Sequence, residues 1–281
     1  MANLSKLKIQ IKLVKNIQKI TGAMELVATS KLKKISKRIG DINQYLSNVY
    51  DVFNYIVLNT ENSIYLKKED VEIKKTLWVI VSSNLGLCGG YNSNIFKLIN
   101  DKIKPWDQVF AIGNKSINYC KSKKISVKKE ISNIDVDFNA DQASYIASDL
   151  LAWYTQNEID AIKIVYTKFI NNILFEPLIL DIFPIIKTDS VTNKEDILLE
   201  PDAETVMETS VLLYLNTIIF GAILESQVSE QASRRISMEA ANKNGKDQIK
   251  TLSILYNRKR QETITQEISE IVGGANAQNK K

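Results

Sequence analysis

Apolar residues recur along the first sixty positions at alternating steps of three and four, and no proline interrupts the run. Thirteen of the sixteen positions on this seam are apolar, and the three exceptions are Gln18, Thr21 and Glu25. This spacing predicts one long helix over 1–60 with a coiled-coil seam, about 85 Å long at 1.5 Å per residue. The sixteen positions are Leu4, Leu7, Ile11, Val14, Gln18, Thr21, Glu25, Ala28, Leu32, Ile35, Ile39, Ile42, Leu46, Val49, Phe53 and Ile56.

A second proline-free stretch follows Pro201 and reaches Gly273 and Gly274 near the end of the chain. Proline is favoured at the first position of a helix and glycine just past its end, so the pattern predicts a second long helix over 201–275. Two helices of an ordinary bundle are the alternative, but average helices are much shorter. Small residues on its seam, which let two helices approach closely, are Ser226, Ser229 and Ser233.

The middle of the chain alternates short apolar runs with helical patterns. Runs typical of buried strands cover 77–83, 108–113, 161–169 and 174–184, and helical patterns cover 93–103 and 140–156. This order predicts a mostly parallel sheet. The predicted fold class is therefore α/β: a long antiparallel coiled coil of terminal helices (1–60 and 201–275) with an inserted Rossmann-like α/β domain over 75–187. Polar connections are expected around 61–75 and 188–200.

The predicted helical hairpin leaves one end without a partner. If the inserted domain closes the hairpin, facing residues have numbers that add to about 262, because both helices rise equally per residue. Met24 then faces the region 234–238, and residues beyond about 262 face nothing. Four apolar residues on that end would each forgo roughly 1.5–3 kcal/mol if they stayed in water, so we expect them to be buried in another protein. They are Ile264, Ile268, Ile271 and Val272.

Composition removes several kinds of chemistry. The 281 residues contain no histidine, which excludes Ser-His-Asp and Cys-His catalysis, and the two cysteines, Cys88 and Cys120, supply neither a zinc site nor a disulfide framework. The net charge of +5 comes from dispersed lysines, so nucleic acid is not an expected partner. The N-terminus lacks a secretory pattern, and the most apolar run, 211–224, is shorter than a membrane span. Any catalysis would have to rest on carboxylates, lysines or backbone groups, which makes an enzyme a less expected function, and we expect the chain to stay in the cytoplasm.

The stretch SSNLGLCGGYNSN, 82–94, follows an apolar strand and precedes a helical pattern, where glycine-rich turns often hold a phosphate. It lacks the lysine of the Walker loop after Gly90, and the glycine spacing of a dinucleotide site fails after Gly86. A structural strand-to-helix turn is the favoured interpretation. Cys88 has no adjacent base that would activate its thiol.

Three blocks carry a family resemblance: VKNIQKITGAMELVATSKL near the start, GLCGGYN after the first strand, and LSILYNRKRQETITQEISEIVGGANA at the end. In this order, and with the layout helix, α/β domain, helix, the whole chain resembles the gamma subunit of F-type ATP synthases. The resemblance implies a central rotor shaft inside a hexamer of alpha and beta subunits. It couples rotation to ATP synthesis or hydrolysis and to proton translocation.

The same resemblance implies the partners and the location. One copy per complex contacts alpha and beta subunits, while the α/β domain joins the epsilon subunit and the membrane c-ring. ATP, ADP and Mg²⁺ bind to the partner subunits, so this chain needs no cofactor and is not catalytic. It would lie at the cytoplasmic face of the cell membrane, attached to it only indirectly.

Four further positions match family residues at or near the ring, and a fifth is placed by the register of the hairpin. Arg260, Gln261 and Thr265 match positions that touch a beta-subunit loop near the top of the shaft. Arg234 matches a shaft arginine near the acidic lever of beta, and Met24 lies across the predicted hairpin from it.

Two departures from the family keep other functions open. Asn84 and Leu85 stand where the family usually has Asp-Arg, and Gly22 stands where it usually has lysine. One alternative is therefore the shaft of a divergent F-type-like ATPase that drives a partner other than a c-ring. A nucleotide-binding enzyme built on the α/β domain and a plain coiled-coil scaffold are the alternatives from other classes.

Overall fold

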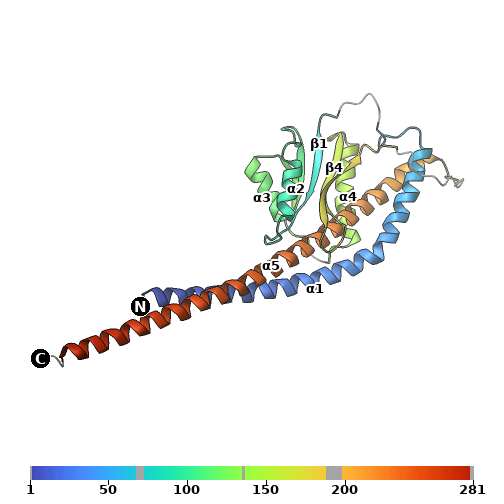
Figure 1. Ribbon diagram of the computed structural model, residues 1–281. Helices are drawn as coiled ribbons and strands as arrows, with labels where there is room; N and C mark the ends of the chain where they lie inside the picture. Colours follow the sequence, from blue (N-terminus) through green and yellow to red (C-terminus); the bar gives the residue numbers. More distant parts are fainter. Residues whose placement is uncertain (1, 68–72, 135–136, 188–197, 279–281) are drawn as a thin grey trace. The chain divides into compact units, whose positions relative to one another are not determined.

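The computed structural model describes residues 2–67, 73–134, 137–187 and 198–278 (Figure 1). By their contacts these form two compact units: unit 1 comprises 1–27 with 235–281, and unit 2 comprises 28–234. The elements are α1 (Ala2–Asn59), β1 (Thr76–Val81), α2 (Tyr91–Ile99), β2 (Gln108–Ile112), α3 (Asn114–Lys123), β3 (Val127–Ile131), α4 (Ala140–Thr155), β4 (Ala161–Phe169), β5 (Phe175–Phe183) and α5 (Ala203–Gln278).

The two long helices are confirmed. All sixteen seam positions of α1 are buried or half-buried. In unit 1 the side chain of Gln18 donates to Asn242 at 3.1 Å, and Asn242 donates to Glu25 at 3.2 Å. In unit 2 the rings of Phe53 and Tyr214 stack with centroids 3.8 Å apart. Both sets of pairs keep the antiparallel register predicted for the hairpin, and the polar break in the seam is a hydrogen-bonded bridge.

In unit 2, α5 is buried on two sides by different chemistry. Leu224, Val228 and Ala232 pack in one apolar cluster with Leu32 and Ile35 of α1. We expected the three serines of the predicted seam to allow close approach to α1, and they do not. They lie against the α/β domain instead, where each makes a hydrogen bond. That prediction was wrong because a helix packed on two sides has a second face that a single-seam pattern ignores.

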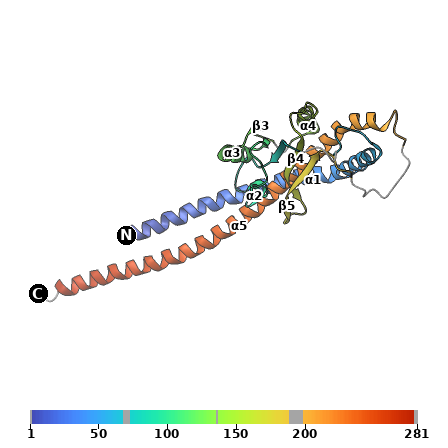
Figure 2. The same ribbon diagram turned by 90° about the horizontal axis from the view of Figure 1, so that it is seen from above.

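The sheet has the strand order β3-β2-β1-β4-β5, with β5 antiparallel and the other pairs parallel. Alternate residues of β1 face opposite cores. Leu77, Val79 and Val81 lie in the core that includes α4 and the helices α1 and α5, whereas Trp78 and Ile80 lie in the core formed with α2 and α3. Figure 2 shows the same layers from above. The Rossmann-like expectation is confirmed, with a mixed sheet.

Some sequence expectations missed or misplaced elements. Residues 127–131 form β3 and 114–123 form α3, and neither was predicted. Charged residues fill most of this edge strand, and the helix is mostly polar, so neither shows clear periodicity. The α5 helix also continues through Gly273 and Gly274 to Gln278, so the predicted glycine stop was wrong. The predicted polar connections fall partly on 68–72 and 188–197, which lie outside the described residues.

Among the described residues, one helix, α5, meets the length and composition expected of a membrane-spanning helix. Its apolar window is 44% buried inside the structure, and the core helix of a globular domain passes the same test. Val211, Leu215 and Ile219 show one reason for the apolar character, because all three lie in the main core of unit 2.

Gly113 provides a test of the sheet edge. It has φ +92°, and an added Cβ would lie 2.2 Å from the carbonyl oxygen of Ser82. We expect Gly113→Ala to lower the free energy of unfolding by roughly 2–4 kcal/mol through backbone strain and overpacking. Urea denaturation followed by the fluorescence of buried Trp78 measures this change.

The matched control is Gly40→Ala. Gly40 lies in the middle of α1, and apart from its chain neighbours and the adjacent helix backbone no described heavy atom lies within 4 Å of an added Cβ. This change should leave stability the same or raise it by up to about 1 kcal/mol. Equal effects at the two positions would contradict the assigned packing of Gly113.

Candidate partner-binding surface and glycine turn

The last turns of α5 in unit 1 expose an apolar stripe. Exposed fractions are 45% for Ile264, 56% for Ile268, 71% for Ile271 and 53% for Val272. The spacing of these residues places them on one face of the helix. Every described side chain beyond Thr263 in this segment is exposed. The structure therefore confirms that these residues lack a partner within the described chain, as the predicted register required.

Polar candidates accompany this stripe. Arg260, Gln261 and Thr265 are all exposed, and the Thr265 hydroxyl donates to the Gln261 carbonyl at 2.9 Å. Glu262 pairs with Arg258 and Lys259, whereas Arg260 makes no ion pair with a described residue. The Arg260 guanidinium thus has its planar set of donors available for a carboxylate or carbonyl of another molecule.

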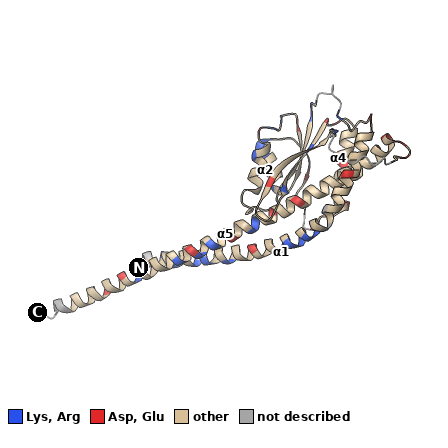
Figure 3. Ribbon diagram, turned by 45° about the vertical axis from the view of Figure 1, so that its right-hand side comes forward, with Lys and Arg blue, Asp and Glu red and all other residues tan. Residues whose placement is uncertain are grey.

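A second exposed stripe escaped the sequence analysis. Its members lie on α1 in unit 1, outside the seam, and half or more of each side chain is exposed. Several turns of α1 carry a second apolar residue in the sequence. The predicted seam comprises only residues at alternating steps of three and four, so it does not include these positions. Figure 3 shows the basic residues of α1 and α5 in blue and the acidic ones in red. The stripe comprises Ile9, Leu13, Ile17, Ile20 and Val27, and Leu26 is exposed on another side of the helix.

Met24 and Arg234 have different surroundings. Met24 is half-buried in unit 1, close in sequence to the second stripe. Arg234 belongs to unit 2 and is only 7% exposed. Their predicted contacts with a ring remain predictions, but the structure gives the Arg234 guanidinium an internal role.

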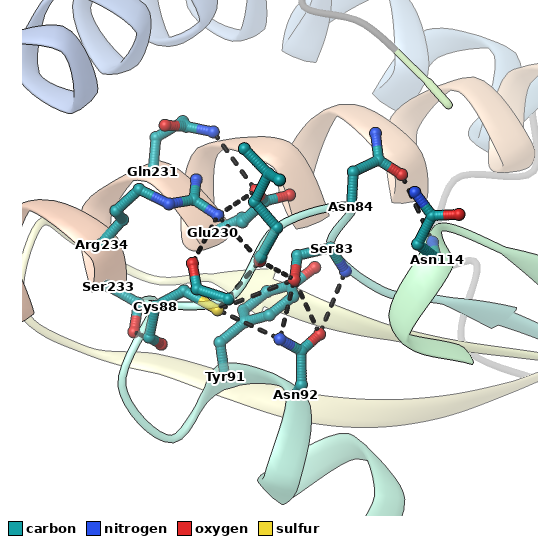
Figure 4. Close-up of polar contacts among 12 residues, drawn as sticks. Ser83, Asn84, Cys88, Tyr91, Asn92, Asn114, Glu230, Gln231, Ser233 and Arg234 are labelled. Carbon is teal, nitrogen blue, oxygen red and sulfur yellow. Dashed lines mark hydrogen bonds and ion pairs between the residues drawn. The ribbon is translucent and has the colours of Figure 1, made fainter. Parts of the chain in front are cut away.

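Arg234 binds the glycine turn that follows β1 (Figure 4). Its Nη2 lies 2.7 Å from the Oε1 of Glu230, one helical turn earlier in α5. The same nitrogen donates to the carbonyl oxygen of Leu85 at 3.2 Å and is 3.5 Å from that of Gly86. The turn therefore presents carbonyl oxygens to a cation of the same chain.

The turn itself is held by local hydrogen bonds. Leu87 and Gly89 have positive φ values of 63° and 54°, and positive φ is typical of tight turns. The Asn92 side chain accepts from the backbone N–H of Ser83 at 3.1 Å and donates to the Ser83 hydroxyl at 2.7 Å. Ser233 of α5 adds a hydrogen bond of 2.6 Å to the carbonyl of Cys88.

The helix α5 also occupies the edge of the sheet where β1 and β4 end. In open α/β sheets, ligands bind at the carboxyl ends of the strands where the strand order reverses. Here the Ser226 hydroxyl lies 2.6 Å from the Tyr91 hydroxyl, and Ser229 donates to the carbonyl of Thr167 in β4 at 3.1 Å. A helix of the same chain thus contacts the position that a nucleotide would take.

Burial changes the ionisation of three side chains around the turn. It raises the pKa of the Cys88 thiol, which is 2% exposed, and that of the Tyr91 hydroxyl. Burial also raises the pKa of Glu230, while Arg234 and Lys31 act in the opposite direction. Within the described ranges, no group of three or more acidic or cysteine side chains could hold a metal ion.

Comparisons with known proteins agree along the chain. A family model described as ATP synthase matches residues 3–278. The ATP synthase gamma chain of Mycoplasma mycoides is 53% identical over 99% of this chain and 100% of its own length. That of Mesoplasma florum is 55% identical over 99% of both chains.

Solved structures show the same fold. The rotor of the Euglena gracilis mitochondrial ATP synthase matches with a TM-score of 0.73 at 17% identity, over 94% of this chain and 99% of that one. The central stalk of the Tetrahymena thermophila mitochondrial enzyme matches with a TM-score of 0.59 at 25% identity, over 79% and 99%. On its full-length sequence identity and its fold, this chain belongs to the ATP synthase gamma chain family and is the non-catalytic central-stalk subunit.

Proposed function

We propose that the exposed end of α5 turns inside a ring of alpha and beta subunits and biases the nucleotide sites of that ring. The observation that carries this proposal is the apolar stripe Ile264, Ile268, Ile271 and Val272, which has no partner in the described chain. A helix end of this kind gains stability when a surrounding apolar surface removes it from water. The second stripe on α1 extends the surface available to the ring.

The proposed mechanism is mechanical. A single asymmetric shaft contacts three equivalent beta subunits differently, and each beta subunit shifts toward the conformation that its contact stabilises. Rotation moves each contact to the next subunit and so changes its nucleotide affinity. Arg260, Gln261 and Thr265 supply the polar contacts near the apolar stripe, and Met24 and Arg234 contribute further along. ATP, ADP and Mg²⁺ remain bound to partner subunits.

We further propose that one copy of the chain joins an epsilon subunit and a c-ring through unit 2. Such a complex lies at the cytoplasmic face of the cell membrane, and this chain reaches the membrane only through its partners. Support comes from the Tetrahymena structure, in which the central stalk is accompanied by a c-ring. The full-length relationship to gamma chains of Mycoplasma and Mesoplasma supports the same assignment.

The apolar stripe gives the first test. Replacing Ile264, Ile268, Ile271 and Val272 together by serine should weaken binding of the full chain to an alpha–beta ring by at least about a hundredfold, since each lost burial costs roughly 1 kcal/mol or more. The melting temperature of the free chain should stay the same, because these side chains are exposed. Surface plasmon resonance measures the affinity.

Tyr145→Ser is the matched control for the stripe. Tyr145 is 76% exposed on α4, in the α/β domain, and its replacement removes a large exposed aromatic side chain from a part of the chain outside the stripe. Ring affinity should be unchanged. If the serine-substituted stripe bound the ring as tightly as the native chain, the proposed function would be wrong.

Arg260 gives a second test. Arg260→Ala should lower ATP hydrolysis by the reconstituted ring about tenfold, because a charged hydrogen bond contributes roughly 1.5–3 kcal/mol. Arg260→Lys should have an intermediate effect, since lysine keeps the charge but loses the planar set of donors. The control is exposed Lys250→Ala, for which no loss is expected. If Arg260→Ala and the native chain supported similar rates of ATP hydrolysis, the proposed contact of Arg260 with the ring would be wrong.

Composition of the native assembly separates the proposed rotor from a divergent ATPase shaft. Asn84 and Leu85, at the positions of the usual Asp-Arg pair, are the observation that keeps this second function in view. Affinity purification through a tagged beta subunit, followed by mass spectrometry, should recover this chain with epsilon and c subunits. Recovery of the ring with other adaptor proteins and no c subunit would favour the divergent ATPase.

A further inference from the structure

We propose that Glu230, Ser233 and Arg234 form a clamp that locks the glycine turn, 84–90, to α5, and that this clamp transmits the turning of α5 to the α/β domain. The inference deepens the proposed rotor function and rests on it. All members of the clamp belong to unit 2, so their contacts lie within one compact unit.

Apolar packing alone does not fix the rotation of α5 about its own axis. On its α1 side, α5 packs through small and aliphatic residues, and such contacts have no direction. On its other side, hydrogen bonds join α5 to the α/β domain at Ser226, Ser229 and Ser233. These bonds recur along successive turns of the helix. A slip of α5 by one residue would rotate the bonding side chains by about 100° and break the whole series.

The glycine turn makes little apolar packing of its own. Leu85 and Leu87 are 70% and 61% exposed, and the buried anchor in this stretch is Cys88 at 2%. The carbonyls of Leu85 and Cys88 accept from Arg234 and Ser233. Bonds from α5 therefore add to the local hydrogen bonds of the turn, such as that from the Ser83 hydroxyl to the Leu85 carbonyl at 2.7 Å.

A buried ion pair with Glu230 keeps the Arg234 side chain in position. The side chains of Arg234 and Glu230 are only 9% and 15% exposed, and the acid precedes the base by four residues, the favourable order on a helix. Removal of either partner leaves a buried charge without compensation, which is strongly unfavourable. Lys31 of α1 adds an attractive interaction with Glu230. The pair thus orients one guanidinium toward the turn.

The neighbouring residue supplies the matched control. Arg235 also forms an ion pair four residues along the helix, with Glu239, but the side chains there are 29% and 61% exposed. Arg235→Gln therefore removes the same kind of group without touching the turn. The test variants are Arg234→Gln and Ser233→Ala. Ser233→Ala removes only one hydroxyl and keeps the charges, so it reports on the clamp even if Arg234→Gln does not fold.

A charge swap separates the ion pair from the clamp. Glu230→Arg combined with Arg234→Glu keeps opposite charges four residues apart on α5. It also places a carboxylate, which accepts and does not donate, against the carbonyls of Leu85 and Gly86. The swap should therefore restore the pair and leave the turn unlocked. A swap that restored native behaviour would overturn the clamp.

Amide hydrogen exchange of the full chain tests the local lock. We expect the amides of Tyr91 and Asn94, which donate to the carbonyls of Cys88 and Gly90 in the turn, to exchange about ten- to a hundredfold faster in Arg234→Gln, because charged hydrogen bonds that hold the turn are lost. Ser233→Ala should show a smaller increase, and Arg235→Gln should show none. Unchanged exchange in both clamp variants would overturn the proposal.

Rotation of the reconstituted complex tests transmission. A rod attached to a cysteine introduced as Tyr145→Cys on α4 reports the angle of the α/β domain, because native Cys88 and Cys120 are buried. With the ring fixed to a surface, clamp variants should increase the angular variance during pauses at least about twofold, since the joint opens locally. Arg235→Gln should match the native chain.

The outcomes distinguish the two claims. No ATP-driven turning of the native chain would overturn the rotor function itself. Normal turning, with the same angular variance in clamp variants as in native chain, would overturn the clamp alone. Faster exchange without a larger variance would also overturn it, because the contacts would then be structural and carry no torque.

Discussion

The fold of unit 2 depends on a helix that is buried on two sides by different kinds of contact. Toward α1, α5 presents Leu224, Val228 and Ala232, which lose contact with water and tolerate sliding. Toward the α/β domain it presents serines and Arg234, whose bonds require one rotation of the helix about its axis. Ile219 and Ile223 of α5 also pack in the apolar core with the sheet, so both faces contribute to stability, and the polar contacts add a defined geometry.

This division brings α5 to the edge of the sheet where Rossmann-like domains hold their ligands. The carboxyl edge of β1 and β4 is the usual place for a nucleotide, yet here Ser226 and Ser229 meet Tyr91 and Thr167 at that edge. The glycine turn offers carbonyl oxygens to an arginine, whereas a phosphate loop offers backbone N–H groups. The same strand-turn-helix geometry is thus used for attachment of a helix.

Sequence patterns predicted the features that depend on period. The seam of α1, four of the five strands and the unpaired stripe at Ile264 all follow from spacing, and the structure agrees. Polar features were harder to predict. The lysine-containing edge strand β3 has little apolar alternation, and the serines of α5 resemble small seam residues until the second face of the helix is known. Arg234 was assigned to a ring contact by resemblance, and its internal bonds become visible only when the turn and α5 are brought together in space.

The central claim is that the end of α5 is stable only inside another protein, and amide hydrogen exchange over 261–275 tests it most directly. The measurement compares the full chain alone with the chain bound to an alpha–beta ring. We expect fast exchange in the free chain, where these side chains are exposed, and strong protection in the complex. Strong protection already in the free chain, or fast exchange that persists in the complex, would contradict the account.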